Sequence, residues 1–90
     1  MSDTLIEVDS EKFNAFLIES ILEHHKDADN FVSYLAYKKL HKLDSFQKAY
    51  VNQILENYYG LHYMAQKNEN YILSVTNKKL CAFFKIKYGL

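Results

Sequence analysis

The chain has 90 residues, a length that accommodates one domain with a modest core but no two-lobed enzyme with a cleft between its lobes. Apolar residues make up 49% and charged residues 24%, so we expect a single compact globular domain over residues 1–90. The sequence contains no membrane-spanning apolar run and no signal-peptide core, which predicts that no membrane is a partner. Cys81 is the single cysteine and cannot form an internal disulfide, which indicates a reducing, cytoplasmic location.

The formal net charge is zero, but the two parts of the chain carry opposite charges. Residues 1–29 hold eight carboxylates and two lysines, whereas residues 30–90 hold nine lysines and three carboxylates. Either the two parts neutralise each other within the fold, or they form an acidic and a basic surface for partners of opposite charge. The chain also lacks Arg, Pro and Trp and favours residues with A/T-rich codons, which is typical of an A+T-rich viral or mobile-element genome.

The start of the chain predicts an arm followed by a helix. Residues 1–8 include three apolar side chains and are expected to form an N-terminal arm or a short strand. Asp9 can cap a helix that begins after it, and Val8 and Phe13 then take the two positions of a hydrophobic staple. The apolar face of this helix is broad, which predicts a central place in the core.

The middle of the chain predicts two more helices. The second is expected near residues 30–43, and the third is expected to end just before a glycine in a left-handed conformation. Both begin after an acidic residue that can act as an N-cap, and the third has the spacing of a capping box. The residues that define these ends are Asp27 or Asp29 for the second helix, and Asp44, Gln47, Tyr59 and Gly60 for the third.

After Gly60 the apolar residues alternate, which predicts two antiparallel strands within residues 61–75. Residues 77–88 fit either a further strand or a helix; the helix would leave Ile86 in water, which favours the strand. The predicted fold is therefore α+β, with three N-terminal helices followed by a small antiparallel β-hairpin or meander.

This order of elements resembles the winged-helix layout over about residues 10–86. The resemblance implies that the third helix enters the DNA major groove and that the hairpin, or wing, touches phosphates. Asn and Gln side chains pair well with adenine, so an A·T-rich site would suit a protein without arginine. The residues assigned to DNA contact are Lys48, Asn52 and Gln53 on the helix and Lys67, Lys78 and Lys79 on the wing.

Motifs for catalysis, cofactors and metals are not found in the sequence. Two glycines are too few for a Gly-rich phosphate loop, and no HExxH or two-cysteine zinc pattern occurs. His24 and His25 are adjacent, so on a helix they project about 100° apart and do not readily chelate one ion. Cys81 lies among apolar residues, as a buried small hydrophobe does. We therefore expect no enzymatic activity, no cofactor and no metal.

Tyrosine and phenylalanine make up 16% of the chain, more than a core of this size needs. Tyrosine is enriched at the hot spots of protein interfaces. Tyr34, Tyr37 and His41 form a row on the second expected helix, with Lys38 beside it. This row either completes the core or contacts a protein partner or a second copy. We expect a small regulatory protein, an inhibitor or adaptor, that acts by protein contact; the alternative is a winged-helix-like transcriptional regulator.

Overall fold

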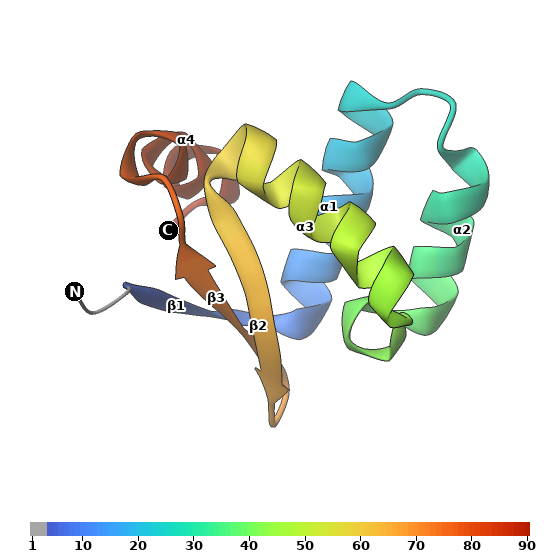
Figure 1. Ribbon diagram of the computed structural model, residues 1–90, viewed down its shortest axis with the longest axis horizontal. Helices are drawn as coiled ribbons and strands as arrows, with labels where there is room; N and C mark the ends of the chain where they lie inside the picture. The colour runs from blue at the N-terminus through green and yellow to red at the C-terminus, as the bar shows by residue number, and fades with distance from the viewer. Residues whose placement is uncertain (1–3) are drawn as a thin grey trace.

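The computed structural model describes residues 4–90, which fold into helices that pack around a small sheet (Figure 1). The elements in chain order are β1 (Leu5–Asp9), α1 (Ser10–His24), α2 (Asp29–Lys38), the short 3₁₀ helix η1 (Leu40–Lys42), α3 (Ser45–Tyr59), β2 (Leu61–Lys67), β3 (Asn70–Val75) and α4 (Lys78–Tyr88). The predicted order of three N-terminal helices followed by a hairpin is wrong, because a strand precedes α1 and a helix follows β3. No helix within residues 4–90 is both long and apolar enough to cross a bilayer.

The first strand becomes the edge of a three-stranded antiparallel sheet. The strand order is β1-β3-β2, so the last strand of the chain lies in the centre. Leu5 pairs with Ser74 and Asp9 with Asn70, across more than sixty residues of sequence. The winged-helix layout was inferred from helices first and a hairpin last, and β1 and α4 both depart from that order.

The start of α1 follows the sequence prediction. The Asp9 carboxylate accepts a hydrogen bond from the Lys12 backbone N–H at 2.9 Å. Val8 and Phe13 are both buried, as a hydrophobic staple requires. The capping residue therefore joins the end of β1 directly to the start of the central helix.

The second helix is shorter than predicted and begins differently. Its N-cap is Ala28, which makes no side-chain capping hydrogen bond, so the expected cap at Asp27 or Asp29 is wrong. The helix ends at Lys38, because Lys39 takes a φ of 69°, a left-handed value that a right-handed helix cannot continue. The segment predicted as one helix over residues 30–43 is therefore two helical pieces with a sharp change of direction.

The third helix has the predicted ends. Asp44 and Gln47 exchange the two hydrogen bonds of a capping box, at 2.7 and 3.2 Å. Gly60 has a φ of 61°, and a Cβ atom there would collide with the backbone carbonyl of Asn77. The Gly60 carbonyl oxygen also accepts a hydrogen bond from the Thr76 N–H at 2.7 Å. The turn after α3 thus lies against the connection between β3 and α4.

Residues 78–88 form the helix α4, so the strand favoured for residues 77–88 is wrong. The Asn77 side chain caps α4 by accepting a hydrogen bond from the Leu80 N–H at 3.1 Å, and Gly89 ends the helix with a φ of 94°. The local capping signals decide the element, and Ile86 is left 80% exposed. A helix was disfavoured because it would leave Ile86 in water, and the structure does leave this side chain in water.

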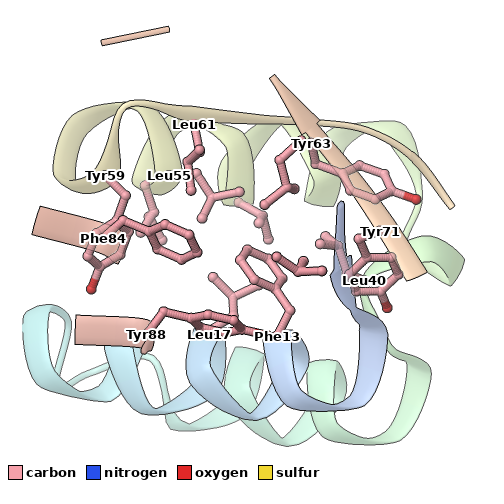
Figure 2. Close-up of a cluster of buried hydrophobic side chains, with 14 of the residues drawn as sticks. Phe13, Leu17, Leu40, Leu55, Tyr59, Leu61, Tyr63, Tyr71, Phe84 and Tyr88 are labelled. Carbon is pink, nitrogen blue, oxygen red and sulfur yellow. The ribbon is translucent and has the colours of Figure 1, made fainter. Parts of the chain in front are cut away.

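The core lies between α1 and α3, and its large side chains are aromatic (Figure 2). The Phe13 ring is at its centre, with ring centroids 6.1 Å from those of Tyr71, Phe84 and Tyr88. A buried polar residue fixes α2 to α1: Asn14 donates to the Leu35 carbonyl at 3.4 Å and accepts from the Leu40 N–H at 3.1 Å. This pair of hydrogen bonds sets where α2 ends and η1 begins.

Candidate protein-contact surface

Three exposed aromatic side chains lie on α2 and α3, the two helices that flank the segment between them. Tyr34 and Tyr37 lie on α2, and Phe46 lies in the first turn of α3, only a few residues beyond the end of α2. Tyr37 is 83% and Phe46 84% exposed, while Tyr34 is partly exposed. We call these three residues the aromatic surface. Apolar rings with so much area in water are a feature of contact sites.

Lysines surround the same connection. The charges of Lys39, Lys42 and Lys48 all act on His41, and we call these three residues the lysine cluster. Asp44 is the one acidic residue between positions 30 and 55, and its carboxylate caps α3. The neighbourhood of the aromatic surface is therefore electropositive and suits a partner that carries carboxylates.

The His41 side chain contacts the core rather than projecting with the exposed aromatic side chains. Its Nδ1 atom lies 3.1 Å from the hydroxyl of Tyr71, the buried aromatic residue of β3. Burial, and then the charges of the lysine cluster, lower the pKa of His41 below 6.5. Because α2 ends at Lys38, the row predicted from Tyr34, Tyr37 and His41 does not continue along one helix.

The outward face of α3 is partly engaged by the sheet. Asn52 accepts a hydrogen bond from the Tyr63 backbone N–H at 2.8 Å, so its side-chain oxygen already links α3 to β2. The Lys48 ammonium lies 5.9 Å from the centre of the Tyr63 ring. Gln53 is exposed and lines a shallow groove of about 270 Å³ with Phe46, Ala49 and Tyr50. This groove extends the aromatic surface along α3.

The remaining residues assigned to DNA contact do not lie together. Lys67 ends β2 at the tip of the hairpin, whereas Lys78 and Lys79 begin α4 at the other end of β3. The six residues of β3 separate these two positions, a length of about 20 Å. Figure 1 shows α4 and the hairpin tip at opposite ends of the sheet. The residues assigned to DNA contact, on α3, at the hairpin tip and at the start of α4, therefore do not form one basic surface.

A larger hollow of about 550 Å³ lies at the loop between α1 and α2, lined by residues that include His24, His25, Phe31 and Tyr50. The His24 ring stacks on Tyr58, with ring centroids 4.0 Å apart, so this histidine packs against α3. Within residues 4–90, no group of three His, Cys, Asp or Glu side chains is placed to hold a metal ion.

No family model, curated protein or solved structure matches this chain. The candidate surface is therefore argued from its own geometry. Of the predicted residues, Tyr34 and Tyr37 belong to the aromatic surface, Lys38 ends the same helix, and His41 lies apart from them in η1. The sequence pattern did not single out Phe46, the third residue of the surface. Its place in the first turn of α3, beside the capping residues, was the available signal that it could point outward.

Proposed function

We propose that this chain is a small binding protein of the inhibitor or adaptor type, which contacts a protein partner through the aromatic surface. The observation that carries the proposal is the exposure of Tyr37 and Phe46 on α2 and α3, the two helices that flank the segment holding Lys39 and Lys42 of the lysine cluster. Aromatic rings supply contact area at little cost in conformational entropy, and charges around them guide the partner and fix its orientation. The partner's site is accordingly apolar in its centre and acidic at its edge.

Site-specific photocrosslinking tests this proposal in extract of the cells that produce the protein. p-Benzoylphenylalanine replaces Tyr37 in one variant and Phe46 in another, and replaces Met64 on β2 as an exposed control. The proposal expects the same adduct from positions 37 and 46 and none from position 64. An excess of the unmodified protein, without the photocrosslinker, must compete for the partner and abolish the adduct. The Tyr37→Ala/Phe46→Ala variant must fail to do so. Equal competition by that variant would refute the surface.

Charge provides the second arm of the test. Replacing Lys39 and Lys42 with glutamine should weaken binding and reduce its salt dependence, because both lysines border the aromatic surface. The DNA-binding alternative predicts a different result, namely binding to duplex DNA that falls at least about tenfold between about 50 and 200 mM salt. Fluorescence anisotropy with A+T-rich and G+C-rich duplexes measures this. Tight, salt-sensitive binding there would replace the protein-contact proposal.

A further inference from the structure

Large apolar side chains also line the face of α4 that points away from the core. Phe83 and Ile86 lie about one turn apart on this face and are 62% and 80% exposed, and Leu90, which follows the left-handed Gly89 at the end of the helix, is 61% exposed. We call them the α4 row. The opposite face of the helix holds its buried residues, Cys81, Phe84 and Tyr88. A helix that has already buried one face against its own core does not need a second apolar face for folding.

The charged side chains of α4 itself are all positive. No carboxylate side chain occurs in the sequence after Glu69, so the whole C-terminal helix is basic. One of its lysines, Lys87, forms an ion pair with Glu23 of α1 at 2.7 Å. Its other lysines are exposed: Lys79 lies one turn before Phe83, in line with the row, and Lys78 and Lys85 lie on one flank of the helix. A surface that covers the row therefore needs apolar contact area together with carboxylates.

The exposed face of α1 has this chemistry. Glu11 and Glu19 are exposed on it, together with the apolar residues Ala15 and Leu22. The helix lies next to α4, and the two helices border a groove of about 170 Å³ lined by Phe16, Glu19, Ser20 and Lys87. An acidic and a basic helix, each with exposed apolar residues, thus stand side by side in the molecule.

We propose that a second copy of this chain covers the α4 row, in a two-fold dimer in which α4 of each copy packs against α1 of the other. A two-fold rotation makes the same contact twice, so both basic faces meet acidic faces. The zero net charge of the chain means that no overall repulsion opposes the approach. Direct packing of α4 on α4 would instead place lysines against lysines.

This dimer is independent of the proposed function. Figure 1 shows α4 at one end of the long axis and α2 at the other. The aromatic surface therefore stays open in both copies, and the dimer presents it twice. Two contacts of two helices each form a small interface, so we expect a dimer that dissociates on dilution.

Analytical ultracentrifugation of the full chain from about 1 μM to about 1 mM tests the dimer. The unmodified chain should shift from monomer to dimer across this range. Ile86→Glu should remain monomeric, whereas the matched control Phe46→Glu, equally exposed but on α3, should still dimerise. Circular dichroism verifies that both variants are folded. A chain that stays monomeric throughout, or an Ile86→Glu variant that dimerises normally, would overturn the proposal.

A pair of charge-reversed variants tests which helices meet. The first variant carries Glu11→Lys and Glu19→Lys, so that both helices are basic; the second carries Lys79→Glu and Lys85→Glu, so that α4 becomes acidic. Each variant alone should be monomeric, and an equimolar mixture should form a heterodimer, because each acidic face then meets a basic one. If the first variant still dimerises alone, α1 does not cover the row and the proposed arrangement is wrong.

Discussion

The Tyr71 hydroxyl and His41 Nδ1 lie 3.1 Å apart and connect the central strand of the sheet to the turn between α2 and α3. The Tyr71 ring is fully buried, packed edge-on against Phe13 and Tyr63, yet its hydroxyl reaches the residue that the lysine cluster surrounds. Together with the hydrogen bonds of Asn14 to the same turn, this contact fixes the backbone that presents the aromatic surface. The surface is thus supported from the core, as a preorganised contact site requires.

Removing the Tyr71 hydroxyl should destabilise the protein by about 1 kcal/mol, the usual net contribution of one hydrogen bond. The variant is Tyr71→Phe, and urea unfolding measures the free energy of unfolding. Tyr88→Phe is the matched control, because the buried Tyr88 hydroxyl has no hydrogen-bond partner within the described part of the chain. Losing that hydroxyl should be neutral or slightly stabilising. Equal losses for the two variants would show that the His41 contact contributes nothing.

His41 should make stability depend on pH. Its pKa is lowered by burial and by nearby lysines, so the folded state takes up the proton less readily than the unfolded state. Its contribution to stability is therefore fully present above the ordinary pKa of 6.5 and is lost as the pH falls from there through the lower folded pKa. His41→Gln keeps a hydrogen-bond acceptor without this titration. Urea unfolding at several pH values should show a smaller acid loss for His41→Gln than for the unmodified chain; parallel curves would contradict this.

Gly60 should tolerate no side chain. Its backbone is left-handed, and an added Cβ would meet the Asn77 backbone rather than a flexible side chain. Gly60→Ala should therefore cost more than the roughly 1 kcal/mol of left-handed strain alone. Gly89→Ala is the control, since Gly89 is also left-handed but has open space around its Cα. The difference between the two variants in thermal or urea unfolding isolates the steric clash; equal destabilisation would mean that the turn adjusts.

Cues that act within a few residues predicted the start of α1 and both ends of α3, but not the ends of α2. The cap at Asp9, the capping box at Asp44 and the left-handed Gly60 are local, and all three are present in the structure. The errors arose where distant contacts decide. The sequence predicts an arm or short strand near the start of the chain, but not that β1 pairs with β3, and it favours a strand over residues 77–88 only if Ile86 is buried. Periodicity predicts which faces are apolar, but not whether the folded chain covers them.

The candidate site was predictable only in part. Tyr34 and Tyr37 stood out because the chain has more aromatic residues than its core needs, and both are exposed to differing extents. His41 lies elsewhere because Lys39 breaks the helix with a left-handed φ, a conformation that no lysine signals in advance. Phe46 was missed because a phenylalanine on an amphipathic helix ordinarily faces the core.

Cys81 should react slowly with thiol reagents in the folded protein. It is buried against the core, and burial raises the pKa of its thiol, while the charge of Lys85 opposes this only in part. Reaction with Ellman's reagent should be slower by about tenfold or more in the native chain than in urea. Fast native labelling would instead indicate that α4 opens readily from the core. The same measurement on Ile86→Glu checks that this variant keeps α4 in place.

The aromatic surface should contribute to binding without contributing to stability. Tyr37→Ala and Phe46→Ala remove side chains that are more than four-fifths exposed, so each should change the free energy of unfolding by no more than about 0.5 kcal/mol. Phe13→Ala, at the centre of the core, is the contrasting variant and should cost about 3–5 kcal/mol. Urea unfolding of the three variants decides the point. A clear loss for Phe46→Ala would mean that its ring packs against the fold in solution, and the aromatic surface would then lose one of the two residues on which its proposed function rests.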